Sequence, residues 1–277
     1  MRLLNIKDRV WADTSGENGG NYGAVILADE IVMVDTGMMH SKTKVVKDFL
    51  EEKFSLPIKK AIYTHWHSDH VFGAQALGDV TLIASAPMRS NCDGALNENW
   101  TPGEIAAWAD EIKDSRPELA KDLGTLEIRL PEMLFEDTLM INNDLTIKLL
   151  GGHTAGSSIV IVEPEHVVFI GDLIFSKSFP YAGDSTCNPN QWIQALEEVM
   201  ERDFEIIISG HGPICDNEEL RVQIEFLSKL REEVNFALKE GLSVGEFIEQ
   251  GRTPEFYKEG VERRLERALV HWFKFYS

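Results

Sequence analysis

Cysteine is scarce in this sequence, and the three that occur, Cys92, Cys187 and Cys215, are an odd number and lie far apart. This number and spacing argue against a disulfide framework and fit a reducing compartment. Long apolar runs are also missing, because no stretch approaches the roughly 18 residues that a bilayer-spanning helix needs. Charged residues interrupt the N-terminal segment before the apolar region of a secretion signal can form. We expect a cytoplasmic protein with no membrane partner.

Positive charge is the second scarcity. Lys and Arg number 27 against 46 Asp and Glu, which gives a formal net charge of −19 at pH 7. A surface of this sign repels polyanions, so the composition argues against a nucleic-acid partner and favours a small-molecule substrate. The Gly-x-Ser-x-Gly nucleophile motif and the Walker phosphate loop are absent as well. Hydrophobic residues, at 43%, are sufficient for a full core.

The apolar pattern predicts two strand-rich halves that each carry helices. In the first half, the runs 24–27 and 31–34 predict a hairpin, and a helical pattern extends from Ser41, a candidate N-cap, to Pro57. A helix is also predicted at 190–202. Further apolar runs predict strands at 61–64, 80–85, 139–141, 145–150, 158–162, 167–170 and 205–209. Two sheets with helices outside them are the most economical arrangement of these elements.

Two segments depart from this pattern. Residues 88–130 carry Trp100, Trp108 and a charged helical stretch, and we expect them to form a helical insertion over an edge of the core. Residues 216–277 show helical periodicity with an apolar stripe. We therefore divide the chain into a domain at 1–215 and a helical extension that packs on it or forms the surface of a homodimer.

The densest group of chemically useful side chains follows the strand predicted at 61–64. The motif HxHxDH places His65, His67, Asp69 and His70 within six residues. Directly after a strand, the first two histidines project to the same side, and a turn brings the last pair to an adjacent point. Imidazole and carboxylate donors without thiolate suit zinc most simply, and iron or manganese are also compatible. The motif therefore predicts a metal site with room for two cations.

Three further donors stand close to the ends of other predicted strands. His153 follows two glycines in a Gly-His-Thr motif, Asp172 belongs to a Gly-Asp motif after the strand at 167–170, and His211 lies in a Gly-His-Gly motif. The glycines allow tight loops that can aim each side chain. Because a catalytic metal needs at least three protein ligands, these residues are candidates to complete the site.

The succession of Asp35-Thr36-Gly37, HxHxDH, Gly-His-Thr, Gly-Asp and Gly-His-Gly resembles the metallo-β-lactamase superfamily over roughly residues 20 to 215. The resemblance implies an αββα four-layer sandwich, in the α/β class, with two mixed β-sheets, flanking helices and a two-metal site at one edge. Asp35 is expected to support the ligand loops through hydrogen bonds and not to bind metal. The implied ligands are His65, His67 and His153 for the first metal, Asp69, His70 and His211 for the second, and Asp172 as the bridge between them.

The chemistry that this resemblance implies is hydrolysis by a zinc-bound hydroxide. Metal ions lower the pKa of a bound water from about 15.7 to about 7 and polarise a carbonyl or phosphoryl oxygen. Asp69 is expected to orient the hydroxide. Ester, thioester and lactone substrates are the favoured class. Trp66, Phe179 and Tyr181 are candidates to line the substrate pocket.

Departures from known branches leave other activities open. His70 and Asp172 stand where class B1 β-lactamases carry Arg and Cys, which disfavours antibiotic hydrolysis, and a phosphodiesterase remains an option. Ser157 stands where glyoxalase II usually has a second histidine. A mononuclear iron persulfide dioxygenase would use His65, His153 and Asp172 and leave the other donors without a task. A metal-stabilised binding protein without catalytic activity is the remaining alternative.

Overall fold

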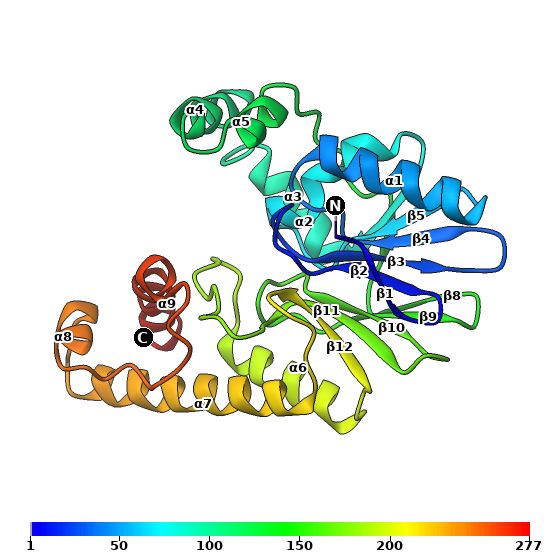
Figure 1. The fold of residues 1–277 in the computed structure, drawn as a ribbon. Coiled ribbons are helices and arrows are strands. Elements are labelled where there is room, and N and C mark those ends of the chain that lie inside the picture. Colours follow the sequence, from blue (N-terminus) through cyan, green and yellow to red (C-terminus); the bar gives the residue numbers. More distant parts are fainter. Residues whose placement is uncertain (1) are drawn as a thin grey trace.

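Two β-sheets lie face to face, and helices cover the outer face of each (Figure 1). We describe a computed structural model, in which residues 2–277 are placed. The layers are helix, sheet, sheet and helix, and both sheets mix parallel with antiparallel neighbours. The predicted αββα sandwich is therefore confirmed.

The first sheet has seven strands in the order β1 to β7. Strands β1 to β4 are antiparallel neighbours, whereas β4 to β7 run parallel. The predicted hairpin is β3 paired with β4, and Ile26 lies opposite Ile31 at its turn. The strands span Leu4–Lys7 (β1), Val10–Asp13 (β2), Tyr22–Ile26 (β3), Ile31–Val34 (β4), Ile58–Ile62 (β5), Thr81–Ser85 (β6) and Met133–Phe135 (β7).

The second sheet has five strands in the order β12-β11-β10-β9-β8. The pairs from β8 to β11 are antiparallel, and β12 lies parallel to β11. The strands span Thr138–Ile141 (β8), Leu145–Leu149 (β9), Ser158–Val162 (β10), Val167–Phe175 (β11) and Ile206–His211 (β12). Two strand predictions were wrong in detail. Strand β11 does not end at residue 170 and runs on for five more residues, and the strand predicted at 61–64 is β5, which begins at Ile58 and ends at Ile62.

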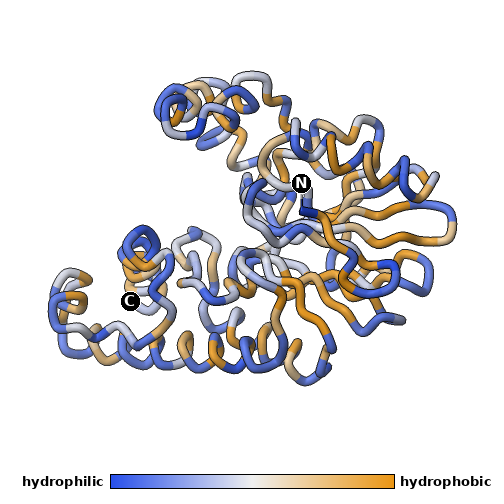
Figure 2. The backbone as a smooth tube through the Cα atoms, in the orientation of Figure 1, coloured by the Kyte–Doolittle hydropathy of each residue, from blue (hydrophilic) through white to orange (hydrophobic). Residues whose placement is uncertain are grey.

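Alternate side chains of the central strands face two different cores. In β4, Ile31 and Met33 pack under the helices of their own sheet, whereas Val32 and Val34 face the second sheet. Both faces of the strand are therefore buried, and such strands have continuous apolar sequences. Figure 2 shows this apolar character along the paired strands.

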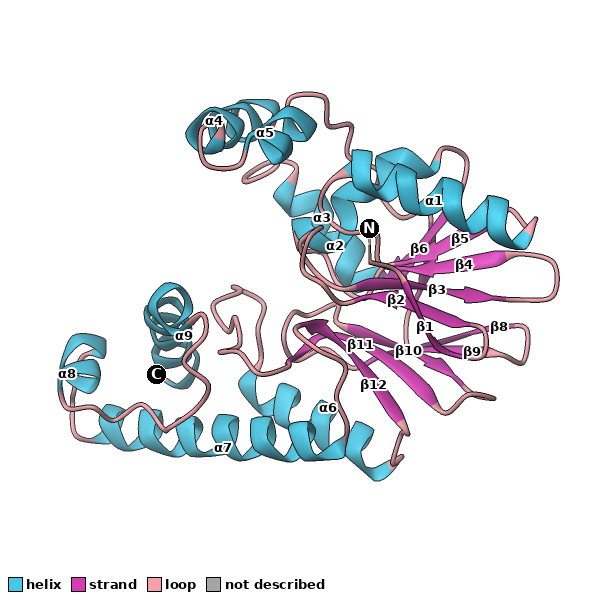
Figure 3. Cartoon of the chain, viewed as in Figure 1, coloured by secondary structure: helices cyan, strands magenta, loops and turns pink. Residues whose placement is uncertain are grey.

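Helices α1, α2 and α3 and the short 3-10 helix η1 lie with the first sheet, and α6 and α7 cover the second (Figure 3). Ser41 does not cap α1, because the helix begins one residue earlier and the N–H of Ser41 donates to Asp122 Oδ2 at 2.9 Å. A carboxylate from a distant helix thus serves this helix end. The bounds are His40–Phe54 (α1), Ser68–Val71 (α2), Phe72–Leu77 (η1), Ala86–Ala95 (α3), Pro189–Glu201 (α6) and Asn217–Lys239 (α7).

The chain between β6 and β7 forms α3 and then the two helices α4 (Pro102–Ile112) and α5 (Pro117–Leu123), which stand away from the sheets (Figure 3). Thr101 caps α4, as its side chain accepts the N–H of Glu104. Trp100 is buried and its ring lies 5.1 Å from that of Phe72, so core packing is its role.

The C-terminal helices share a core with the second sheet. Helices α8 (Val244–Glu249) and α9 (Val261–Tyr276) follow α7, and the buried Trp272 of α9 belongs to the same apolar cluster as Trp192 of α6. The boundary at residue 215 and the homodimer stay predictions. Within residues 2–277, no helix combines the length and the apolar character that crossing a membrane requires.

Candidate metal centre

All seven predicted ligands meet at one edge of the sandwich. The loop after β5 and the start of α2 carry the HxHxDH motif, the loop between β9 and β10 carries His153, and the last residue of β12 is His211. Asp172 lies inside β11, not beyond its end as predicted. Gly171 has φ of +55° and interrupts the pairing of β11 with β12, which explains why the apolar pattern seemed to stop there.

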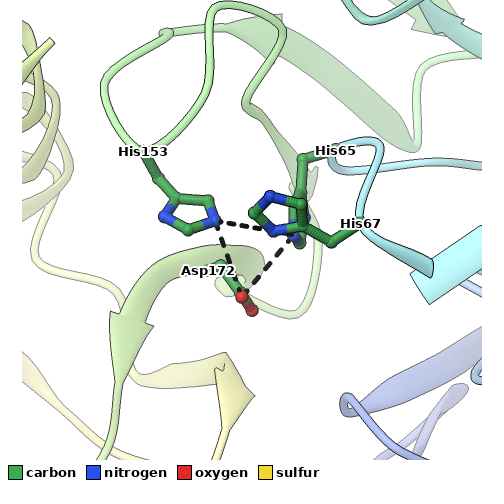
Figure 4. A group of neighbouring side chains, drawn as sticks. All are labelled: His65, His67, His153 and Asp172. Carbon is green, nitrogen blue, oxygen red and sulfur yellow. Dashed lines mark hydrogen bonds and ion pairs between the residues drawn. The ribbon is translucent and has the colours of Figure 1, made fainter. Parts of the chain in front are cut away.

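The first group of donors combines three histidines with one carboxylate (Figure 4). His67 Nδ1 lies 3.1 Å from both His65 Nε2 and His153 Nε2. Asp172 Oδ2 lies 3.5 Å from the same nitrogen of His65 and 3.6 Å from that of His153. Four potential ligand atoms therefore surround one point.

The second group contains Asp69, His70 and His211. His211 Nε2 lies 3.4 Å from Asp69 Oδ2 and 3.4 Å from Asp172 Oδ2. His70 Nε2 lies 3.1 Å from Asp172 Oδ1. The Asp172 carboxylate therefore lies between the two groups and is near imidazoles of both.

These separations fit divalent metal ions. A tetrahedral zinc ion with bonds of about 2.0–2.1 Å holds its ligand atoms about 3.3–3.4 Å apart. The contacts above, between 3.1 and 3.6 Å, bracket that value. In addition, His70 Nε2 and Asp172 Oδ1 are buried, and although they lie 3.1 Å apart, neither has a hydrogen-bond partner of suitable geometry among the described residues, as expected for atoms that bind an ion.

The protonation states of several donors also suit cations. Burial, followed by the charge of His70, lowers the pKa of His65 to about 4, so its imidazole is neutral at pH 7. Although burial acts in the opposite direction, His211 and His70 lower the pKa of Asp172 well below its usual range. Asp172 and Asp35 outweigh burial and raise the pKa of His70, so a cation at its Nε2 has to displace a proton.

Asp35 reaches both groups of donors through hydrogen bonds. Its backbone is in the left-handed region with φ of +56°, and its carboxylate accepts the N–H and the hydroxyl of Thr64, each at 2.7 Å. Asp35 Oδ2 lies 2.9 Å from His70 Nδ1, and Thr64 Oγ1 lies 3.1 Å from His65 Nδ1. Protons on these two Nδ1 atoms leave Nε2 of each ring as the atom that can bind a metal, at His70 after its Nε2 proton is displaced.

One residue that orients a histidine was not found from the sequence. Asp184 Oδ2 lies 3.0 Å from His67 Nε2 and accepts the indole N–H of Trp66 at 3.1 Å. Its other oxygen accepts the backbone N–H and the hydroxyl of Thr186, a local turn that the Asp-x-Thr spacing permits. The sequence offers no signal that this turn lies beside His67, because the contact joins positions more than a hundred residues apart.

A cavity of about 290 Å³ opens over the donors. Trp66 and Tyr181, two of the three pocket candidates, line it, together with Phe175 and Arg264 of α9, which the sequence did not suggest. Phe179 does not line it, because its side chain is only 1% exposed and packs in the core against Phe226. Its Phe-Pro-Tyr segment directs only the tyrosine to the cavity.

A larger cleft of about 910 Å³ adjoins this cavity, and both are lined by Ser68 and Asp69. Residues of the insertion, among them Trp108 and Leu119, form one part of its wall, and Arg267 of α9 forms another. In Figure 1, α4 and α5 of the insertion lie above α9, and both segments lie to the left of the two sheets. The donors therefore lie at the base of a site that can admit a ligand.

A two-sheet sandwich with a histidine and aspartate cluster at one edge defines a class of metal-binding proteins. The family model described as Metallo-beta-lactamase superfamily matches residues 15–211, and the chain belongs to this superfamily. Its members include hydrolases such as β-lactamases and alkylsulfatases.

Curated relatives are distant. The linear primary-alkylsulfatase of Pseudomonas sp. (strain ATCC 19151) is 22% identical over an alignment of 291 positions, gaps included, that covers 88% of this chain and 54% of that protein. The metallo-β-lactamase type 2 of Bacillus cereus is 24% identical over 226 residues, 78% of each chain. The chain thus spans about half the length of the alkylsulfatase.

Solved structures show the same fold. The sec-alkylsulfatase Pisa1 from Pseudomonas sp. superposes with a TM-score of 0.76 at 16% identity, over 99% of this chain and 50% of that one. The DIM-1 metallo-β-lactamase superposes with a TM-score of 0.63 at 19% identity, over 82% of this chain and 96% of that one.

Proposed function

We propose that the chain is a hydrolase that binds two divalent ions, most simply zinc, and cleaves an ester, thioester or lactone. The position of Asp172 carries the proposal, since its Oδ2 lies 3.4–3.6 Å from His65, His153 and His211. A carboxylate near both groups of donors is placed to bind both ions at once. A site that holds a single metal ion does not require such a bridging ligand.

Bound divalent ions supply a water of lowered pKa and polarise the oxygen of the bond to be cut. The protein contributes the position of that water. Asp69 borders the cavity, and although burial acts in the opposite direction, His70 and His211 lower its pKa, so it is ionised at neutral pH. We assign to this carboxylate the role of accepting a hydrogen bond from the water and holding it toward the substrate.

Tyr181 is the candidate hydrogen-bond donor to the substrate. Burial, with a contribution from Asp184, raises the pKa of its phenol, so the hydroxyl keeps its proton at neutral pH. Its ring lies 5.5 Å from that of His67. A neutral phenol at this distance can donate to an oxygen of the substrate, while Trp66 provides an apolar wall.

Alkyl sulfate hydrolysis is the second candidate. The superposition with the sec-alkylsulfatase extends over 99% of this chain, including the C-terminal helices, whereas that with DIM-1 covers 82%. We also infer a reducing, cytoplasmic setting, supported by three free cysteines of which two are buried.

The test is hydrolysis measured under anaerobic conditions with zinc-loaded protein and a panel of lactone, thioester, ester, phosphodiester, alkyl sulfate and β-lactam substrates. We expect turnover of a carbonyl ester, thioester or lactone by the wild type and loss of at least 100-fold in His211→Ala. The matched control is His166→Asn, which changes an exposed histidine at φ of +55°, a conformation that Asn accepts. Oxygen uptake with a persulfide, measured separately in air with iron-loaded protein and accompanied by no hydrolysis of any substrate in the panel, would instead support the iron dioxygenase.

A further inference from the structure

Three arginines of α9 line the cavity over the metal donors and the cleft that adjoins it. Arg264 lines the cavity over the metal donors, and Arg263 and Arg267 line the adjoining cleft. The chain carries a net charge of −19, so carboxylates are abundant. Even so, none of these three guanidinium groups lies within 4.0 Å of a carboxylate in the part of the chain that the structure describes. Their charges are therefore available to a ligand.

Arg264 is the best placed of the three. Its guanidinium carbon lies 4.9 Å from the centre of the Phe175 ring, and that ring stacks on His211 at 5.0 Å with an angle of 10° between the planes. One N–H of Arg264 donates to the carbonyl oxygen of Phe179. A guanidinium has five N–H donors, so this contact fixes the group and leaves donors for a ligand.

The surroundings of Arg264 favour the binding of a negatively charged group. Burial is the main cause of its lowered pKa, which means that the guanidinium has lost much of its hydration. The carboxylates of Asp172, Asp69 and, to a smaller extent, Glu259 act in the opposite direction, and the first two are those that we assign to the metal ions. Two divalent ions outweigh these two carboxylates, so the loaded centre is itself positive. A desolvated arginine beside a positive centre is stabilised when an anion binds between them.

We propose that Arg264 binds an anionic group of the substrate, a carboxylate, sulfate or phosphate, next to the bond that is cut. This inference rests on the proposed hydrolase function and narrows its substrate class from neutral to anionic esters, thioesters or lactones. The planar guanidinium presents parallel N–H donors that match two oxygens of such a group. Trp66, which lines the same cavity, is suited to the apolar remainder of the substrate.

The first experiment measures the binding of inorganic sulfate to the purified full-length protein by titration calorimetry, with the metal content of every sample determined in parallel. We expect Arg264→Met to weaken sulfate binding at least tenfold and Arg264→Lys to give an intermediate value, because Lys keeps the charge and loses the fork. The control is Arg252→Met. Arg252 also lies over an aromatic ring, that of Phe236, and forms an ion pair with Glu233 at an N–O distance of 2.8 Å. It lines neither the cavity nor the adjoining cleft. Equal sulfate affinity in wild type and both Arg264 variants at equal metal content would overturn the proposal.

The second experiment compares two esters of the same alcohol, one with a terminal carboxylate on the acyl chain and one with a methyl group in its place. We expect the wild type to prefer the anionic ester in kcat/KM, and Arg264→Met to reduce that preference at least tenfold while Arg252→Met retains it. A preference that is unchanged in Arg264→Met contradicts the proposal. If the wild type cleaves neither ester and no lactone or thioester of the panel, the proposed function fails, and the sulfate titration still decides whether Arg264 binds anions.

Discussion

The substitution Asp35→Asn tests how the metal centre is held, because it changes two oxygens into one oxygen and one amide. Asn tolerates the left-handed φ of +56° at this position, so the backbone cost is small. The remaining oxygen can still accept the N–H of Thr64. The amide nitrogen then faces the Thr64 hydroxyl and His70 Nδ1, which both need an acceptor in the wild type.

The expected loss follows from these two contacts. Removing a partner that orients a metal-binding histidine typically lowers metal affinity about 10–100-fold. This corresponds to about 1.4–2.8 kcal/mol of binding free energy. Asp35 contacts His70 directly and His65 only through Thr64, so the second metal should weaken more than the first.

The assay is a zinc titration of metal-free protein in competition with a chromogenic chelator. The control is Asp13→Asn, which alters a buried carboxylate that accepts hydrogen bonds from Ser15 and Tyr22 and contacts no histidine among the described residues. We expect the control to bind zinc within about threefold of the wild type. Affinities in Asp35→Asn that stay within twofold of the wild type for both ions would refute the supporting role of Asp35.

Three further substitutions probe the site and its support. Gly210→Ala places a Cβ atom 2.0 Å from Asp172 Oδ1, and we expect at least a 100-fold loss of turnover together with a lower metal content. Asp184→Asn removes the acceptor at His67 Nε2 and should lower affinity for the first metal about tenfold in the chelator titration. Trp272→Ala opens the core under α9 and should lower the free energy of unfolding by about 3–5 kcal/mol in urea denaturation.

A specific result would contradict each of these predictions. The control for Gly210→Ala is Gly103→Ala, at a helix position where the added Cβ has no contact closer than 4.0 Å, and it should keep full turnover. An equal loss of turnover in both variants would show that the clash with the Asp172 side chain is not the cause of the loss. Unchanged zinc affinity in Asp184→Asn would show that His67 is held without this contact. A loss below about 1 kcal/mol in Trp272→Ala would mean that the cavity collapses or that α9 adds little to the core.

The candidate ligands could be predicted from the sequence because each lies in a local pattern. The HxHxDH motif and the glycines beside His153, Asp172 and His211 mark short loops next to buried strands. Loop position follows from strand order, and the strands themselves follow from apolar runs. The bulge at Gly171 was the exception, since a Gly-Asp pair inside a strand has the same pattern as the end of one.

The residues around the ligands could not be predicted in the same way. Asp184 and Arg264 act through contacts with segments far away in the chain, and no local spacing encodes those contacts. Phe179 and Tyr181 are two residues apart, yet one side chain enters the core and the other the cavity. Both outcomes depend on how α9 and the loop after β11 pack on the second sheet.

The metal content of the purified chain tests the central claim most directly. Elemental analysis should find about two divalent ions, zinc foremost, per wild-type chain and a lower content in His211→Ala, because that variant lacks a donor of the second group. One ion per chain in the wild type, retained without loss in His211→Ala, would contradict the two-metal centre.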